Sequence, residues 1–320
     1  MRFFGKTNID FMGQRRRWYI ISLSVILAGL LSIAVKGIDF GIDFIGGTEL
    51  VVNFSQAPDL GAVRTMMTNS GFQRSEIKTF GKDERILIRT EQQGTGTEVG
   101  DRIRAGLKQS FASMNPKVLE ETKIGPKIGA ELRRDAIYAV IFSLIAIAIY
   151  VAFRFKFIYG IGALVALFHD VLVTLGIISL VDGLTPYTNF EIDQNMIAAF
   201  LTLVGLSVND TVVIFDRIRE NQKIYRSMKM SELINKSLNE TLSRTIITSG
   251  TVFIVTIILF LFGGEVNRGF GFALTIGIIT GTYSSIYIAS AIVLDYTNRK
   301  LGKVKQTVAA GKPSYETLHQ

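Results

Sequence analysis

Apolar residues along this chain are gathered into six long runs separated by polar segments. Each run is close to the roughly 20 residues that a helix needs to cross the hydrocarbon core of a bilayer. The pattern therefore predicts an α-helical polytopic membrane protein with six transmembrane helices. The predicted spans are Trp18–Val35, Ala136–Phe153, Phe157–Leu180, Asn195–Ile214, Thr245–Phe262 and Gly269–Leu294.

The first run has a second interpretation, because Arg15, Arg16 and Arg17 precede it as they would precede the apolar region of a signal peptide. Its length of about 18 residues and the lack of an Ala-x-Ala-like cleavage site favour a helix that is retained.

Between the first two spans lies a polar segment whose pattern is typical of a soluble domain. The run Thr48–Phe54 alternates apolar and polar residues as a half-buried strand does, whereas Ile103 and Leu107 recur at helical spacing. Residues 81–84 suit a hairpin turn. The order β-α-β-β-α-β predicts an α+β ferredoxin-like sandwich. Its expected elements are Thr48–Phe54, Leu60–Gly71, Ser75–Phe80, Arg85–Thr90, Glu98–Phe111 and Lys117–Lys123.

These assignments divide the chain into four parts. We expect a cytoplasmic N-terminus with the first span at 1–36, an extracytoplasmic (periplasmic) ferredoxin-like domain at 37–133, a five-helix bundle at 134–296 and a basic cytoplasmic tail at 297–320. The bundle would include a polar cytoplasmic connector between its third and fourth helices. The acidic residues of the inserted domain are spaced like those of a solvated surface.

The net charge of +8 suggests binding to nucleic acid or anionic lipid until the basic residues are located. Five lie in residues 1–17, two in 154–156, seven in 215–244 and five in 295–320, whereas the two short connectors on the other side, 181–194 and 263–268, hold only Arg268. This asymmetry is the positive-inside pattern and places both termini in the cytoplasm. Juxtamembrane Lys and Arg account for the charge without a nucleic-acid partner.

Several kinds of chemistry are excluded by missing residues. The chain has no cysteine, and its two histidines are His169 and His319, so a thiolate metal site or a metalloprotease site is not expected. Gly-x-x-x-x-Gly-Lys-Ser/Thr and Gly-x-Ser-x-Gly are absent, which argues against ATP binding and against a serine hydrolase. No cofactor is expected, and an ion gradient is the plausible energy source for any work that the protein does.

Asp210 is the most informative residue, because it places an ionisable side chain inside a predicted span. A carboxylate in a membrane costs several kcal/mol unless it is paired, hydrated or protonated, and it marks a functional site by default. At ~1.5 Å per residue, Asp210 lies roughly 22 Å from the outer end of its helix. On the fifth span Arg244 and Thr248 share one helix face with Thr241 and Thr251.

These groups could form a proton relay, in which Asp210 takes and releases the proton and Arg244 keeps the carboxylate ionised between transfers. Other interpretations stay open. Asp210 could be a structural hydrogen-bonding group, and Arg244 could be an anchor that reaches the cytoplasmic interface. A carboxylate with hydroxyls could also serve Na⁺ as well as H⁺.

Two glycine pairs and one polar pair complete the candidate residues. Gly46 and Gly47 precede the first strand and suit a turn from helix to sheet that needs positive φ or close backbone approach. Gly277 and Gly281 form a Gly-x-x-x-Gly pattern, which is typical of close helix packing. His169-Asp170 is a second intramembrane pair, for which helix–helix bonding and function are equally supported. Neighbouring residues on a helix point about 100° apart, so we expect at most one of the two to face a pathway.

Five stretches in chain order resemble the SecD/SecF family, and within it the smaller SecF type. They are Gly41–Thr48, Ala166–Leu172, Gly205–Asn221, Leu242–Ser249 and Gly281–Ala289. The single modest insert and the run Val-Asn-Asp-Thr-Val-Val-Ile-Phe-Asp-Arg favour SecF over SecD.

The resemblance implies a membrane fold of the resistance-nodulation-division (RND) type and a subunit of the Sec translocase in the bacterial inner membrane. It implies that the proton-motive force drives late steps of protein export. Asp210 would then be the protonatable carboxylate, Arg244 its basic partner and Thr248 a polar neighbour. The implied partners are SecD, SecYEG, YajC and the translocating unfolded polypeptide.

Two other functions compete with proton-driven export. The chain could be a scaffold of the SecD/SecF complex that conducts nothing, or a small RND-type exporter of lipids or drugs. An enzyme is the least supported class, because no catalytic constellation appears.

Overall fold

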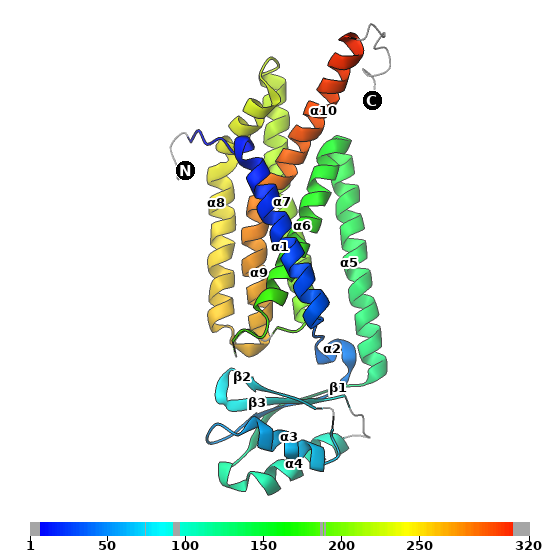
Figure 1. Ribbon diagram of the computed structural model, residues 1–320, viewed down its shortest axis with the longest axis vertical. Helices are drawn as coiled ribbons and strands as arrows, with labels where there is room; N and C mark the ends of the chain where they lie inside the picture. The colour runs from blue at the N-terminus through cyan, green and yellow to red at the C-terminus, as the bar shows by residue number, and fades with distance from the viewer. Residues whose placement is uncertain (1–6, 74, 92–96, 186–187, 189, 310–320) are drawn as a thin grey trace.

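The computed structural model describes residues 7–73, 75–91, 97–185, 188 and 190–309. Within these residues six helical segments are long and apolar enough to cross a membrane, which confirms the predicted fold class. They form an elongated bundle with a small sheet domain at one end (Figure 1). The spans are α1 (Arg15–Lys36), α5 (Pro126–Arg154), α6 (Phe157–Val181), α7 (Gln194–Ile224), α8 (Met230–Phe262) and a sixth made of α9 (Gly264–Ser284), a π-helical turn η3 (Ser285–Ala289) and α10 (Ser290–Ala309).

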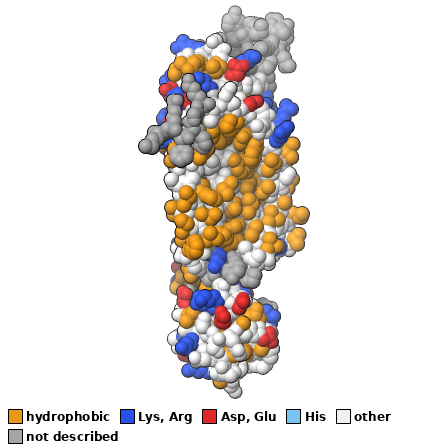
Figure 2. Space-filling view, turned by 90° about the vertical axis from the view of Figure 1, so that its left-hand side faces the viewer, with side chains coloured by type: hydrophobic (Ala, Val, Ile, Leu, Met, Phe, Trp, Pro, Cys, Tyr) orange, Lys and Arg blue, Asp and Glu red, His pale blue; other side chains and the backbone are white. Residues whose placement is uncertain are grey.

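The exterior of the bundle is apolar, as a lipid-facing surface should be. On the face shown in Figure 2, hydrophobic side chains form a broad band across the middle of the bundle, and charged side chains gather toward the ends of the molecule. Helix α5 stands at the edge of the bundle (Figure 1), and only 6% of the residues in its most apolar 18-residue stretch are buried. The start of α1 and the end of α10 both lie at the end of the bundle opposite the sheet domain (Figure 1).

Several helices run further than the apolar pattern predicts. Helix α5 already begins at Pro126, within the range assigned to the inserted domain, and proline is favoured in a first helical turn. The predicted polar connector 215–244 is helical except for residues 225–229. There α7 and α8 continue side by side, and the Asn221 amide donates to Ser237 Oγ at 2.9 Å. Beyond the last span α10 extends to Ala309, while residues 310–320 of the predicted tail lie outside the described residues.

The inserted domain has the predicted β-α-β-β-α-β order, with an antiparallel sheet of strand order β2-β3-β1-β4. Helices α3 and α4 cover the face of the sheet that points away from the bundle (Figure 1). Leu50, Val52, Ile86 and Ile88 share one buried core with these helices. The elements are β1 (Gly47–Asn53), α3 (Leu60–Asn69), β2 (Ser75–Phe80), β3 (Lys82–Thr90), α4 (Glu98–Ser110) and β4 (Lys117–Ile124).

The hairpin between β2 and β3 is tighter than predicted. The sequence pattern assigned residues 81–84 to the turn, but Phe80 pairs directly with Lys82. Gly81 makes this possible because its φ of 79° is accessible to glycine at little cost. The prediction was wrong because the charged residues of this segment look like a loop, although they are the exposed start of β3.

The helix-to-sheet turn predicted at Gly46 and Gly47 is present. A short helix, α2 (Ile42–Ile45), ends at Gly46, where φ is 78°, and Gly47 opens β1 with a φ of 139°. A Cβ atom on Gly47 would lie 2.5 Å from the carbonyl oxygen of Thr90 on the neighbouring strand. Both the backbone conformation and the space therefore require glycine here.

We expect Gly47→Ala to destabilise the inserted domain by about 1–3 kcal/mol or more, because it adds backbone strain and a clash with β3. The measurement is the thermal unfolding of the purified full chain in detergent. Gly125→Ala is the matched control, since Gly125 has a φ of −68° and open space around its Cα. Equal unfolding temperatures for the two variants would contradict the assigned role of Gly47.

Candidate ion-relay site

Asp210 lies in the buried core of the bundle with 9% of its surface exposed. Its Oδ2 atom accepts a hydrogen bond of 2.8 Å from Ser249 Oγ of α8. A cavity of about 30 Å³ adjoins the carboxylate, and Ser207, Asn209 and Thr248 are among the residues that line it. The surface of this cavity is mostly apolar, but the Asp210 carboxylate and several hydroxyl groups adjoin it, and its volume is large enough for a water molecule. The carboxylate is therefore buried, but it has a hydroxyl partner and room for water.

Ser249 is a residue of this site that the sequence analysis missed. Thr248, which was predicted to be the polar neighbour, lines the cavity, but its Oγ1 donates to the Arg244 carbonyl of its own helix at 2.9 Å. The two hydroxyl residues are adjacent in sequence. Which one faces Asp210 depends on the rotation of α8 about its axis relative to α7, and the sequence does not show this rotation.

Arg244 is near Asp210 without touching it. The guanidinium is close enough for its charge to act on the carboxylate, but the two side chains form no ion pair in this conformation. Arg244, Thr248 and Thr251 are exposed along the outer face of α8. An exposed arginine on a membrane-spanning helix is costly in lipid. We call Arg244, Thr248 and Thr251 the open polar face of α8.

The predicted Gly-x-x-x-Gly pattern brings α9 against α7. A Cβ atom on Gly277 would lie 2.6 Å from the Leu203 side chain, and one on Gly281 would lie 3.0 Å from Cβ of Ser207. These glycines therefore have the close-packing role that the pattern favours.

His169 and Asp170 are both buried, and Asp170 is 0% exposed. His169 Nδ1 lies 2.9 Å from Asp170 Oδ1, so the two side chains bond to each other. The helix–helix bonding that the sequence analysis left open is present at this pair, because Asp170 also bonds hydroxyl groups of two other helices. Side-chain rotation brings the two polar ends together although their Cβ atoms leave the helix in different directions. Asp170 Oδ2 also accepts from Ser207 and Ser284, on two other helices.

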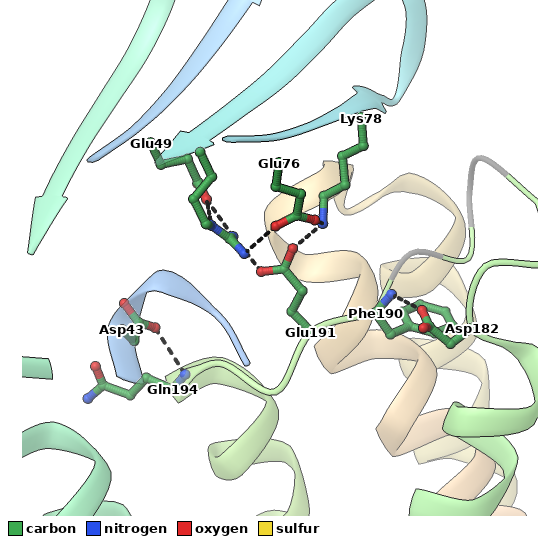
Figure 3. Close-up of polar contacts among 9 residues, drawn as sticks. Asp43, Glu49, Glu76, Lys78, Asp182, Phe190, Glu191 and Gln194 are labelled. Atoms are coloured by element: carbon green, nitrogen blue, oxygen red, sulfur yellow. Dashed lines mark hydrogen bonds and ion pairs between the residues drawn. The ribbon is translucent and has the colours of Figure 1, made fainter. Parts of the chain in front are cut away.

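A cluster of ion pairs joins the sheet to the connector between α6 and α7 (Figure 3). Glu191 of the connector lies between two cations of the sheet, with its Oε2 2.5 Å from Arg89 Nη2 and its other oxygen bonded to Lys78. Arg89 also bonds Glu49 at 2.6 Å and Glu76 at 3.1 Å. We call these five residues the sheet–connector cluster. The description of the domain's carboxylates as a solvated surface was wrong for Glu49, which is largely buried.

Burial and ion pairing act in opposite directions on the carboxyl groups of the sheet–connector cluster. Burial opposes ionisation of Glu191, but Lys78 and Arg89 outweigh that effect and hold the pKa of this carboxyl below its usual value. For Glu49 burial is the larger effect and raises the pKa, although Arg89 lowers it in part. Glu191 is therefore the carboxylate that the two cations stabilise most.

The connector is also bonded to the turn before β1. Ile192 exchanges main-chain hydrogen bonds with residues 39–41. Its N–H donates to Asp39 O at 2.8 Å, and Gly41 N donates to Ile192 O at 3.0 Å. The Asp43 carboxylate accepts from the backbone N–H of Gln194, at the first residue of α7, at 3.0 Å (Figure 3). The inserted domain is thus attached to the helix that carries Asp210.

Asp193 gives this junction a dependence on pH. It caps α7 by accepting from Met196 N at 2.6 Å, and it faces the cavity of about 240 Å³ between sheet and bundle. Burial, reinforced by the nearby Asp43 and Glu191 carboxylates, raises its pKa from 3.8 to about 6 despite the cap. The folded protein therefore holds a proton that the unfolded chain has already lost between these two pH values.

Because the folded protein keeps the Asp193 proton to higher pH than the unfolded chain does, the free energy of unfolding decreases as pH rises from about 4 to about 6. We expect Asp193→Asn to keep the cap and to remove this loss, so that the variant is more stable than the original chain by about 2–3 kcal/mol at pH 8. At pH 4 the advantage should vanish. Thermal unfolding at both pH values checks this, with Asp193→Ala as the control that lacks the cap. A constant difference between original and Asn variant at both pH values would refute it.

The sequence matches known families over most of its length. The family described as "Protein export membrane protein SecD/SecF, C-terminal" matches residues 105–299. The "SecD/SecF GG Motif" matches residues 31–58, the segment that contains Gly46 and Gly47.

Curated relatives cover nearly the whole chain. The chain is 45% identical over 309 residues to the protein translocase subunit SecF of Rhodothermus marinus, an alignment that covers 97% of this chain and 100% of the relative. It is 43% identical to the protein translocase subunit SecF of Thermodesulfovibrio yellowstonii, with 91% and 95% of the two chains covered.

Two crystal structures show the same fold. SecDF of Thermus thermophilus, a translocon-associated membrane protein, aligns with a TM-score of 0.80 at 36% identity over 91% of this chain. SecDF in its Super-membrane-facing form aligns with a TM-score of 0.70 at 35% identity over 95% of this chain. The chain spans 39% and 41% of these longer chains. By these matches the chain belongs to the SecD/SecF family, as a SecF-type membrane subunit of the protein-export translocase and not an enzyme.

Proposed function

We propose that this SecF-type subunit couples proton flow across the cytoplasmic membrane to late steps of protein export. The observation that carries the proposal is the environment of Asp210, a buried carboxylate with one hydroxyl partner and an adjoining cavity that is large enough for a water molecule. A group in this setting can exchange a proton with water, whereas a carboxylate in a tight ion pair would be held ionised. Thr248 lines the same cavity.

Arg244 is the switchable partner in this proposal. It now makes no ion pair with Asp210, but its charge acts on the carboxylate from nearby. Loss of the proton from Asp210 would increase that attraction and favour a closer approach of α7 and α8. Two helix arrangements would then alternate with protonation, which is how a local change of charge moves a bistable element.

SecD is the partner that we place against the open polar face of α8. Arg244 cannot stay exposed to lipid at low cost, and a second membrane subunit would provide polar groups and water there. The positive-inside pattern puts both termini in the cytoplasm and the inserted domain on the opposite side. SecYEG, YajC and the emerging polypeptide are the further partners that follow from the family.

Movement of α7 would reach the inserted domain through the connector. Glu191 bonds both Arg89 and Lys78 of the sheet, and Asp43 bonds the first turn of α7. A shift of the α7 start would therefore be transmitted to the sheet, and the domain would hold or pull the emerging chain.

The test is protein export into membrane vesicles that contain the SecD/SecF complex, with the proton gradient present or collapsed and the sodium gradient set independently. We expect stimulation to follow the proton gradient. Stimulation that follows sodium alone would assign the site to Na⁺, and stimulation that follows neither gradient would support the scaffold function instead.

A further inference from the structure

A chain of hydrogen bonds through the core of the bundle links α1, α6, α7 and α9 and surrounds the His169–Asp170 pair. From Asp170 it runs to His169, whose Nε2 lies 3.0 Å from the Tyr283 hydroxyl, and Tyr283 lies 3.3 Å from Ser22 Oγ of α1. Ser207 Oγ donates to Asp170 Oδ2 at 2.5 Å, and Ser284 Oγ donates to the same oxygen at 2.9 Å. The proposed relay of Asp210, Arg244 and Thr248 uses none of these groups.

We propose that His169 and Asp170 together form a second proton-binding site that takes up a single proton. In the deprotonated state, neutral His169 donates from Nδ1 to Asp170 and accepts at Nε2 from the Tyr283 hydroxyl. The site then carries a charge of −1 in the apolar core, where no Lys or Arg bonds Asp170 among the described residues. A buried unpaired charge is costly, and adding one proton makes the pair neutral overall.

The geometry accommodates the added proton without movement of heavy atoms. The proton binds His169 Nε2, which becomes a donor, and the Tyr283 hydroxyl hydrogen rotates away from the ring toward Ser22 Oγ. Tyr283 then accepts from the imidazolium and donates to Ser22. Both hydroxyls can serve as donor or acceptor at these distances. Each state therefore keeps every contact of the chain, and only the direction of the donors changes.

Ser207 connects this site to the one at Asp210. It lies one helical turn before Asp210 on α7, lines the cavity beside Asp210, and bonds Asp170. One hydroxyl thus separates that cavity from the second site. Helix α9 packs directly against Ser207 at Gly281, where an added Cβ atom would lie 3.0 Å from the Ser207 Cβ atom.

The other titratable groups around α6 are accounted for. Among the elements that pack against α6, α7 carries Asp210 and η3 carries Tyr287. Charged groups of α1, α5 and α10 lie toward the helix ends, where Arg15 pairs with Asp295 and Arg154 pairs with Asp216. Lys36 donates to carbonyl oxygens at the sheet end of α6.

The test uses ring-¹⁵N histidine in the SecD/SecF complex in lipid nanodiscs. His319→Gln in this chain and unlabelled SecD leave His169 as the single labelled histidine. Between about pH 9 and about pH 5, NMR should show a change from one protonated ring nitrogen to two. Asp170→Asn should keep His169 neutral across this range, because the counter-charge is gone. Tyr283→Phe should move the change to at least tenfold higher proton concentration, because a charge-assisted bond is lost.

Tyr287→Phe is the matched control, since Tyr287 also stacks on Trp18 but does not bond His169, and it should leave the transition in place. A His169 that keeps one protonated nitrogen at every pH, or that titrates equally in Asp170→Asn, overturns the proposal. The Asp210→Asn variant separates the two sites. If Asp210→Asn abolishes proton-driven export while His169 still titrates, both sites are supported. If export by Asp210→Asn is unchanged, only the role of Asp210 is refuted.

Discussion

Asp210→Asn is expected to remove the entire proton-driven part of protein export while the complex with SecD stays assembled. The amide has nearly the same size as the carboxyl group and can still accept the hydrogen bond from Ser249. It cannot release a proton, so the alternation between charged and neutral states stops. The measurement is export into vesicles with the proton gradient present and collapsed, with co-purification of SecD as the check on assembly.

Two further variants of the same region are compared with Asp210→Asn, one as a control and one as a graded change. Asp216→Asn changes a carboxylate on the same helix that pairs with Arg154 and is partly exposed, so export should stay within about twofold of the original level. Ser249→Ala removes the hydroxyl partner but keeps the proton carrier, and it should give an intermediate loss. If Asp210→Asn retained full gradient-dependent stimulation, Asp210 would have no part in the mechanism.

Arg89→Gln is expected to have the largest effect on the contact between the inserted domain and the bundle. The change leaves Glu49, Glu76 and Glu191 near one another with only Lys78 to balance them. Breaking a buried ion pair by removing one partner costs about 3–5 kcal/mol. Thermal unfolding of the full chain measures the loss. Amide hydrogen exchange in the connector around Ile192 shows whether the junction opens first.

A double-mutant cycle with Glu191→Gln isolates the contact across the junction. The two single changes should each be costly, and the double change should cost clearly less than their sum, because neither charge is then left alone. Arg104→Gln is the control within the inserted domain, since Arg104 pairs with Glu121 and Asp101 away from the connector. Additive effects of Arg89→Gln and Glu191→Gln would show that the pair does not couple the two parts. Export that falls in Glu191→Gln but not in Arg104→Gln would support transmission through the connector.

Much of the architecture could be predicted because it depends on local properties of the chain. A lipid-spanning helix needs a long apolar run, and a half-buried strand needs alternation, so both leave a pattern within about 20 residues. The chemical candidates were found in the same way, since a carboxylate such as Asp210 stands out in an apolar run. The helix ends were less predictable, because α7 and α8 continue as polar helices outside the apolar region.

The partners of the candidate residues could not be predicted, because they come from distant parts of the chain. Glu191 meets Arg89 across 102 positions, and Ser284 meets Asp170 across 114. Gly29 and Gly176 approach so closely that a Cβ atom on Gly29 would lie 2.3 Å from the Gly176 Cα atom, a crossing of α1 and α6 that no motif indicated.

The sequence by itself determined the six spans, the ferredoxin-like insert and the presence of ionisable groups inside the membrane. The tertiary structure decided which hydroxyl serves Asp210, that His169 and Asp170 share one chain of hydrogen bonds, and that Glu191 bonds the sheet to the bundle. Hydropathy and periodicity record whether a residue is buried and in which type of element. The partner that a buried residue meets is set by the rotation and packing of whole elements, and these depend on every contact between them at once.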